Sequence, residues 1–218
     1  TVRRATDNST QGIGFNIFGE LDTVSLAAFC GASDGFVDTW HDQSSNGNDA
    51  TQTATSAQAK IYDGTTVVSL LNSKPVLTVA SKQKILQASY TGSSTVTIAS
   101  VTTVLRSDSL LAASGSNQFL RARLGSTASC YNNTSTSSNH VNGVSTTLST
   151  RQDVYNAFFN NQSLLFSIAD ISSFTNLQLG QNTSTGSNDY QELIIWNSDQ
   201  SSNRTNIESN INTFYNIY

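Results

Sequence analysis

"VDTWHDQSSNGNDATQ", residues 37–52, is the stretch of this sequence that decides the fold. Val37 and Trp40 are typical of a β-strand, and residues 44–48 that follow them are turn formers. We therefore expect a strand that ends in a tight polar turn. The aspartates and the histidine of this stretch have either a structural or a chemical role there.

The residues of the turn themselves favour a structural role. Asn46-Gly47 readily adopts positive φ, and the side chains of Asp42 and Ser44 can accept backbone N–H bonds across the turn. For Asp42 we favour this role over a catalytic one. The residues that we assign to the structural turn are Trp40, Asp42, Gln43, Asn46 and Gly47.

The composition excludes several classes of partner. Charged residues are 12% of the chain, against about 25% in an average soluble domain, while Ser, Thr and Asn supply more than a third of it. The net charge of −4 leaves no basic face for a phosphate backbone, so we expect no nucleic-acid partner. No apolar run reaches the ~20 residues that span a bilayer, so we expect no membrane insertion. A surface of hydroxyls and amides indicates a virion-surface or extracellular location.

The chain contains no Met, even at position 1, and no signal peptide, so we expect a processed piece of a longer protein. Its two cysteines, Cys30 and Cys130, form either a disulfide or two buried thiols. Their spacing does not decide between these alternatives.

Short apolar, β-branched-rich segments recur between polar turns, as in an antiparallel β-sandwich. The predicted strands are residues 36–40, 74–80, 95–105, 119–124, 155–159, 163–169 and 190–196. Alternation at Val96 and Ile98 indicates a sheet with one solvated face. We expect the polar segments 132–139 and 180–189 to be loops. No repeat is present, so we predict one all-β domain over residues 1–218.

Two helices interrupt this pattern. In residues 21–31, Asp22 is a natural N-cap and Gly31 can end the helix. The residues that share the apolar face of this helix are Leu26, Phe29 and Cys30.

A second helix is predicted near the C-terminus, capped by Ser198 or Asp199. Its apolar stripe consists of Ile207, Ile211, Phe214 and Tyr215. Glu208 lies on the opposite face and is expected to be solvated. We expect the stripe to dock on the sandwich.

Residues 39–52 resemble the W-Y-D-Q-S-G-N-G-N-x-A-x-Q signature of laminin-G-like, concanavalin A-like jelly-roll domains. These domains occur in phage tail-fibre and other surface proteins, and in the catalytic domain of fungal arabinofuranosidase B enzymes. Residues 2–15 resemble the segment V-R-R-x-S-D-N-x-x-x-D-I-G-F that precedes the signature, and residues 190–218 resemble the family's last strand and closing helix. The resemblance implies a concanavalin A-like jelly-roll β-sandwich with a short helix in the N-terminal region and a C-terminal helix. Residues 90–185 match nothing.

The sequence departs from the family pattern at His41 (usually Tyr), Ser45 (usually Gly) and Gly12 (usually an acid). In families of this kind the aspartate–glutamine turn packs near the N-terminal arginines. The resemblance therefore implies that Asp42 pairs with Arg3 or Arg4.

Glycoside hydrolysis generally needs two carboxyl groups about 5–9.5 Å apart. If the protein is an enzyme, Glu192 is the best candidate, because its strand neighbours are apolar and a half-buried carboxylate there has a raised pKa. A second acid cannot be assigned, and we favour a protein without catalytic residues.

A metal site has weaker support. His41 and His140 have no companion at ligand spacing, so we expect no zinc. We expect no cofactor, with calcium left open, because some laminin-G-like relatives bind it. Asp49, Asp189 and Asp199 can converge on such a site only through the fold.

The remaining hypothesis is that the polar loops bind a sugar. Sugar sites on β-sandwiches combine amide and carboxylate groups, which bond to hydroxyls, with flat aromatic rings. The residues that we predict to contact a ligand are Tyr131, Asn132, Asn133, Asp189 and Tyr190.

We therefore predict a non-catalytic carbohydrate- or receptor-binding module of a phage virion or bacterial surface protein. Its partner is a cell-surface glycan or host receptor, and a homotrimer within a larger fibre or capsid assembly is one possible arrangement. The alternatives are a glycoside hydrolase of arabinofuranosidase type and a structural virion decoration protein.

Overall fold

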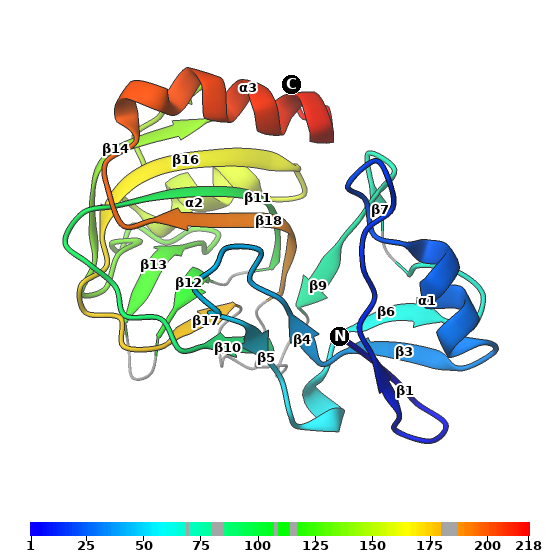
Figure 1. Ribbon diagram of the computed structural model, residues 1–218. Helices are drawn as coiled ribbons and strands as arrows, with labels where there is room; N and C mark the ends of the chain where they lie inside the picture. Colours follow the sequence, from blue (N-terminus) through cyan, green and yellow to red (C-terminus); the bar gives the residue numbers. More distant parts are fainter. Residues whose placement is uncertain (69, 80–84, 107–108, 114–116, 180–186) are drawn as a thin grey trace.

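Two six-stranded antiparallel sheets pack face to face in the computed structural model, which describes residues 1–218 except 69, 80–84, 107–108, 114–116 and 180–186 (Figure 1). The first sheet has the order β13-β12-β17-β10-β5-β4 and the second the order β15-β14-β16-β11-β18-β9. The predicted all-β sandwich is therefore confirmed. No helix in the described ranges is long and apolar enough to cross a membrane.

The strands of the first sheet are β4 (Thr39–Trp40), β5 (Ala50–Thr51), β10 (Ile85–Ala88), β12 (Ser109–Ala112), β13 (Gln118–Arg121) and β17 (Leu177–Leu179). Those of the second sheet are β9 (Leu77–Val79), β11 (Val96–Arg106), β14 (Ser135–Val141), β15 (Val144–Ser145), β16 (Ser163–Asp170) and β18 (Ser187–Trp196).

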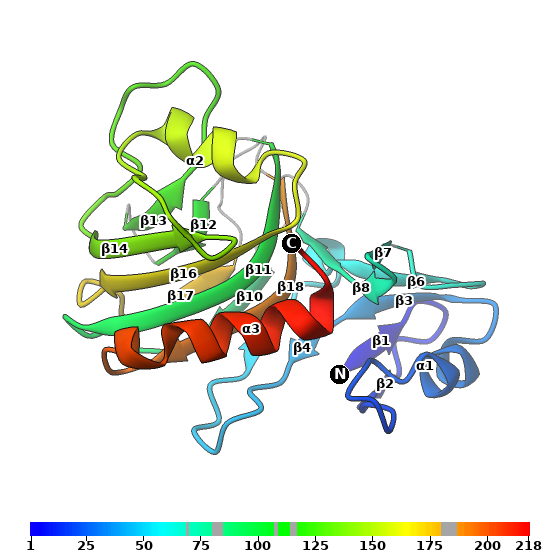
Figure 2. The same ribbon diagram turned by 90° about the horizontal axis from the view of Figure 1, so that it is seen from above.

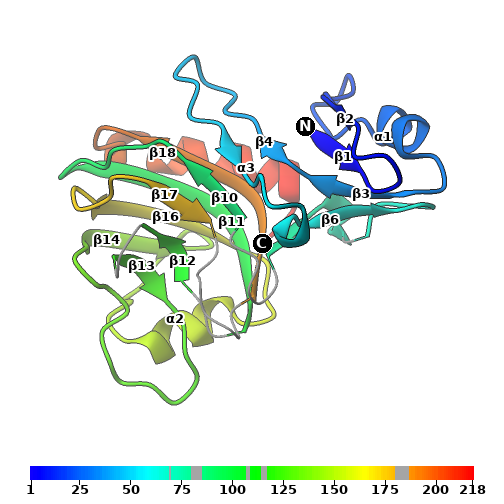
Figure 3. The same ribbon diagram turned by 90° about the horizontal axis from the view of Figure 1, so that it is seen from below.

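A separate N-terminal layer stands beside one end of the sandwich (Figure 3). Its strands are β1 (Val2–Arg4), β2 (Thr10–Gln11), β3 (Asp34–Val37) and β6 (Lys60–Asp63), followed by the short pair β7 (Leu70–Leu71) and β8 (Lys74–Pro75). The helices and 3₁₀ turns are α1 (Thr23–Cys30), η1 (Thr55–Ala57), α2 (Arg151–Phe158), η2 (Ser201–Asn203) and α3 (Arg204–Tyr215).

Each part has its own apolar core. Between the two sheets, Leu111 and Phe119 belong to the same buried cluster as Ile98 and Leu165. In the N-terminal layer, the helix α1 buries its apolar side in a second cluster, which consists of Val2, Leu26, Cys30, Ile61, Tyr62 and Val67. The prediction of a single domain is not tested by these cores and stays a prediction.

The central strand β11 is buried on both faces, so the predicted solvated face is wrong for this part of the sheet. Val96 and Ile98 face the sandwich core, while Ala99 and Val101 form a third cluster under α3. Figure 2 shows α3 lying across this sheet. The sheet has a second dry face because the helix covers it.

The helix α3 docks as predicted through Ile211 and Tyr215, which are buried. Two expectations about its faces are wrong. Phe214 is 36% exposed, whereas Glu208 is only 3% exposed and pairs with Arg204. The N-terminus of α3 has no side-chain cap, because Asp199 instead accepts the Ser201 N–H, at 2.7 Å, in the preceding turn η2.

The helix α1 forms as predicted. The Asp22 side chain accepts the Ser25 N–H at 3.0 Å, and Gly31 ends the helix with φ +58°. Cys30 is buried in the N-terminal layer and Cys130 in the sandwich core, and both thiols are free. The disulfide alternative is therefore wrong.

Two local predictions in the middle of the chain are also wrong, and a third is wrong at its last residues. Residues 155–158 belong to helix α2, and Phe159 is its C-cap, because Thr150 and Asp153 form a capping box that starts the helix before them. Residues 135–139 of the expected loop are part of β14, which pairs with β16. Of the expected loop 180–189, residues 180–186 lie outside the described residues, and residues 187–189 form the start of β18.

The close packing around Gly92 predicts that this position tolerates no side chain. A Cβ atom there would lie 1.8 Å from the carbonyl oxygen of Ile171, which is backbone and cannot rotate away. We expect Gly92→Ala to lower the free energy of unfolding by about 3 kcal/mol, measured by urea denaturation. The control is Gly12→Ala, since a Cβ at exposed Gly12 meets nothing within 4 Å. Equal stabilities of the two variants would contradict the packing seen here.

Candidate functional site

A hollow of about 200 Å³ lies where the N-terminal layer meets the sandwich and the end of α3. Residues from all three parts line it, among them Val2 of β1, Gln191 of β18 and Tyr215 of α3. Its volume is below the roughly 300–1,000 Å³ of clefts that hold drug-sized ligands. The hollow therefore suits one small group, such as a single sugar ring or a short acyl chain.

The lining combines an apolar floor with aromatic rings and a few polar groups, as ligand sites generally do. The floor includes Val2, Val37, Ile61, Val76 and Leu77. The aromatic residues are Phe15, Trp40, Tyr190, Phe214 and Tyr215. The polar and charged side chains are Thr1, Glu20, Thr39, His41, Gln43, Lys74 and Gln191.

The loop after Trp40 forms one rim of the hollow and is held by Asp42. One carboxylate oxygen of Asp42 accepts the Ser44 N–H at 2.8 Å and the other accepts the Asn48 N–H at 2.9 Å. The hydrogen bonds from Ser44 and Asn48 keep the pKa of Asp42 below its usual range. The carboxylate is thus ionised and fully engaged in shaping the turn.

The other turn residues complete this loop. Asn46 N–H donates to the Ser44 hydroxyl at 3.2 Å, and Gly47 has φ +69°, while Asn46 itself does not have positive φ. The Gln43 amide donates to the carbonyl oxygen of His41 at 2.9 Å. Trp40 is partly buried against the sandwich core.

The pairing of Asp42 with Arg3 or Arg4, which the family resemblance implies, is not formed. Arg3 is buried and donates to Gln58 Oε1 at 2.6 Å. The Gln58 amide in turn donates to Asp38 at 3.0 Å. Arg4 pairs with Asp7 instead. Asp38, which also belongs to residues 37–52, is instead connected to Arg3 through the side-chain amide of Gln58.

His41 lies at the rim between a hydroxyl and a carboxylate. Its Nε2 is 2.8 Å from Thr1 Oγ1 and its Nδ1 is 2.8 Å from Asp49 Oδ2. The second oxygen of Asp49 accepts the Asp42 N–H at 2.8 Å. That backbone bond and the His41 bond hold the pKa of Asp49 below its usual range, so Asp49 is ionised at neutral pH.

The opposite wall of the hollow carries an ion pair. Lys74 Nζ contacts Glu20 Oε1, and the same ammonium group lies 4.2 Å from the ring centroid of Phe214. The hydrogen bond from Lys74 lowers the pKa of Glu20, so this carboxylate does not hold a proton near neutral pH. Glu20 is therefore unsuited to act as a general acid.

Glu192 has the raised pKa expected for it, because burial disfavours its charged form. The Tyr215 hydroxyl donates to Glu192 Oε2 at 2.8 Å and opposes this shift. Glu192, however, faces α3. The carboxylate among the described residues that line the hollow belongs to Glu20. The described residues that line this hollow therefore include no pair of carboxyl groups.

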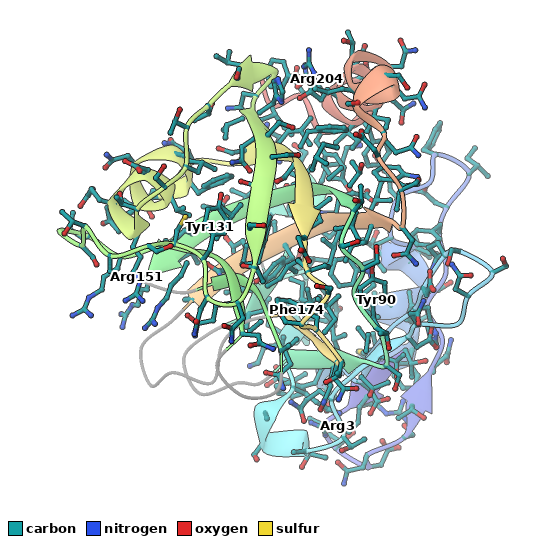
Figure 4. The ribbon with its side chains drawn as sticks, turned by 90° about the vertical axis from the view of Figure 1, so that its left-hand side faces the viewer. Arg3, Tyr90, Tyr131, Arg151, Phe174 and Arg204 are labelled. Carbon is teal, nitrogen blue, oxygen red and sulfur yellow. The ribbon has the colours of Figure 1, made fainter. Side chains whose placement is uncertain are left out.

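The five predicted ligand contacts are not brought together. Tyr131 lies in the part of the sandwich near Arg151 and away from Arg3 (Figure 4). Its hydroxyl bonds with Thr136 Oγ1 at 3.0 Å, and burial raises the pKa of Tyr131 to about 12. Asn132 and Asn133, the next two residues, are exposed.

Asp189 and Tyr190 lie within β18, and both are buried. The Tyr190 hydroxyl donates to the carbonyl oxygen of Leu110 at 2.7 Å and so joins the two sheets. Tyr190 nevertheless contributes to the lining of the hollow, unlike the other four predicted contacts. As ligand contacts, all five remain predictions.

The three aspartates proposed for calcium do not converge. Asp49 bonds with His41, Asp189 is buried in β18, and Asp199 holds the turn η2. In the described ranges no group of three or more His, Cys, Asp or Glu side chains is placed to hold a metal ion.

Sequence reasoning missed most of the hollow because its residues come from distant segments. Thr1, Phe15, Glu20, Lys74 and Phe214 become neighbours only through the packing of the N-terminal layer and α3. One local signal was present in the sequence, since His41 stands where the resembling family has a tyrosine.

No protein-family model matches this sequence, and no curated protein sequence is similar to it. Among solved structures, a mutant of a GH54 α-L-arabinofuranosidase soaked with 4-nitrophenyl α-L-arabinofuranoside has a similar fold. The TM-score is 0.60, with 12% identity over 98% of this chain, and this chain spans 58% of the length of that protein. At this identity the likeness shows a shared β-sandwich fold alone.

The Asp42 turn can be tested by removing its acceptor. We expect Asp42→Ala to lower the free energy of unfolding by about 1–2 kcal/mol, because two backbone N–H groups lose their partner. Asp42→Asn keeps an acceptor oxygen and should lose less. Chemical denaturation measures both, with Ser45→Ala, an exposed position in the same loop, as the control. Equal stability of all three variants would contradict the role of Asp42 as a brace.

The raised pKa of Glu192 predicts a specific pH dependence of stability. The folded chain binds this proton more tightly than the unfolded chain does, so the contribution is full below the unfolded pKa of about 4.3 and is lost as the pH rises through the folded value. We expect the Tm of the wild type to fall relative to Glu192→Gln as the pH rises from about 4 to about 7.

Glu20→Gln is the control for this experiment, because the pKa of Glu20 is shifted in the opposite direction. The stability that Glu20 contributes is lost as the pH falls, so the wild type should gain relative to this variant as the pH rises. A difference between wild type and Glu192→Gln that does not change with pH would disprove the shift.

Proposed function

We propose that this protein is a carbohydrate- or receptor-binding module that does not cleave glycosidic bonds. In this proposal the hollow beside the N-terminal layer receives one sugar unit of a cell-surface glycan. The observation that carries the proposal is the composition of the lining, which combines aromatic rings with the Gln43 amide and hydroxyl groups around a space for a single small ring.

The chemistry of the hollow supports a neutral sugar. Aromatic rings such as Phe15 and Trp40 can contact the C–H face of a sugar, and the Gln43 amide can bond to its hydroxyls. The two charges in the lining, on Glu20 and Lys74, are paired with each other. An uncharged ligand does not compete with this ion pair.

A glycoside hydrolase of arabinofuranosidase type is the second candidate. Two observations favour it: the fold likeness to a GH54 α-L-arabinofuranosidase and the raised pKa of Glu192. The position of Glu192 opposes it, since this carboxyl group bonds to Tyr215 on the face of the sheet that α3 covers. We therefore favour binding over hydrolysis.

The setting of this module is also a proposal. A place on a phage virion or bacterial surface, with a glycan or host receptor as the partner and a homotrimer within a fibre or capsid, is compatible with the low charge of the chain. The same composition suits a structural decoration protein, which binds no glycan.

Substitutions in one loop separate the binding proposal from its alternatives. Phe15 lines the hollow and is 58% exposed, whereas Phe18 is 72% exposed and is outside the lining. We expect saturable binding on a glycan array that includes α-L-arabinofuranosides, weakened about tenfold in Kd by Phe15→Ala and unchanged by Phe18→Ala. Titration calorimetry with the best glycan measures the affinities.

The same samples test the alternatives. Binding with no released sugar, unaffected by Glu192→Gln, is the expected result. Release of free sugar that is lost in Glu192→Gln would replace the binding proposal with the hydrolase. Absence of both binding and release would leave the structural virion role.

A further inference from the structure

We propose that Thr1, His41 and Asp49 form a hydroxyl–imidazole–carboxylate relay, and that this protein hydrolyses short-chain carboxylic esters at the rim of the hollow. The inference does not rest on the proposed glycan binding. It rests on the geometry of these three side chains and on their position beside an apolar space.

The distances fit an activated nucleophile. The 2.8 Å separations of Thr1 Oγ1 from His41 Nε2, and of His41 Nδ1 from Asp49 Oδ2, fall within the roughly 2.6–3.2 Å expected between nucleophile, base and orienting group. Because the Asp49 carboxylate is ionised, it favours the His41 tautomer in which Nδ1–H donates a hydrogen bond to it. The lone pair on Nε2 then faces the Thr1 hydroxyl, which is the arrangement that a general base needs.

Two of the three members, Thr1 and Asp49, are held by the surrounding backbone. Asp49 is oriented by the Asp42 N–H, which donates to its second oxygen at 2.8 Å. The carbonyl oxygen of Thr1 accepts the Asp38 N–H at 3.0 Å, and its nitrogen donates to the Thr39 carbonyl at 2.7 Å. The contact with His41 is made by the side chain of Thr1.

The location of the relay indicates the class of substrate. Thr1 and His41 line the hollow, and the side chain of His41 is 46% exposed, so a ligand can reach both. The neighbouring floor is apolar, with Val2 and Val37 among its residues. A space of about 200 Å³ accepts an acetyl to butyryl chain and excludes bulky acyl groups.

The proposed reaction takes place in two balanced steps. The Thr1 hydroxyl gives its proton to His41 Nε2 while its oxygen attacks the carbonyl carbon of the ester. The tetrahedral species collapses, the C–O bond to the alcohol breaks, and the alkoxide leaves with the proton from His41. Water, activated by the same imidazole, then releases the carboxylic acid from Thr1.

A donor for the developing oxyanion is available in the same loop. The Gln43 side-chain amide lines the hollow and uses one N–H for its 2.9 Å bond to the His41 carbonyl. Its second N–H can donate to the carbonyl oxygen of a bound ester.

The experiment measures hydrolysis of 4-nitrophenyl acetate by the full chain and by variants of known Tm. We expect Thr1→Val and His41→Gln to lower kcat by at least about a hundredfold, the minimum usually supplied by a positioned base. Thr1→Ser keeps the hydroxyl and should keep the activity. His140→Gln should not change it, which separates the relay from unspecific imidazole catalysis, because His140 is the other histidine of the chain.

Two further measurements distinguish a catalytic role of these residues from a purely structural one. Rapid quenching followed by peptide mass analysis should find one acetyl group on the peptide that contains Thr1. Asp49 acts through His41, so Asp49→Asn should lower kcat with little change in KM. The proposal is overturned if the wild type is no faster than buffer, if folded Thr1→Val keeps the activity, or if the acetyl group is absent from Thr1.

Discussion

Burial of the central strand β11 on both faces is the constraint on which the rest of the structure depends. One face packs against the first sheet through Ile98 and the other against α3 through Ala99 and Val101. Each face removes apolar area from water, at about 25 cal/mol per Å². The hydroxyls of Thr97, Ser100 and Thr102 on this buried strand donate to backbone carbonyls. Thr97, for example, donates to the carbonyl of Ser198 at 2.9 Å and so ties the start of the closing segment to the sheet.

The hollow is a consequence of how the N-terminal layer is attached to this body. Gln191 stands at an irregularity in the pairing of β11 with β18, where Val101 pairs with Glu192 and Thr102 with Tyr190. The side chain of Gln191 is thereby free to donate to the carbonyl oxygens of Leu71 and Lys74, each at 3.2 Å. One amide therefore joins the sandwich to the β7–β8 hairpin. The ion pair of Lys74 and Glu20 continues the connection to the N-terminal layer.

The polar turn after Trp40 has a structural role and also a position that permits chemistry. Asp42 is engaged by backbone N–H groups, which explains why a chain so poor in charge retains a carboxylate there. The same turn brings Asp49 back beside His41, and β1 places Thr1 on the other side of that ring. The structural and the proposed chemical roles of the stretch thus belong to different aspartates.

Signals between residues close in sequence determined most of the secondary structure of this protein. Alternating β-branched segments specified the strands, and Asp22 with Gly31 specified the first helix, because these signals act within a few residues. Residues 155–159 show how an apolar run is ambiguous, since the capping box of Thr150 and Asp153 starts a helix that includes residues 155–158. Only the tertiary structure decided that Glu208 is buried and that Thr1 meets His41. The physical reason is that burial and side-chain contacts depend on which elements pack together, and chain segments tens of residues apart carry no local record of that packing.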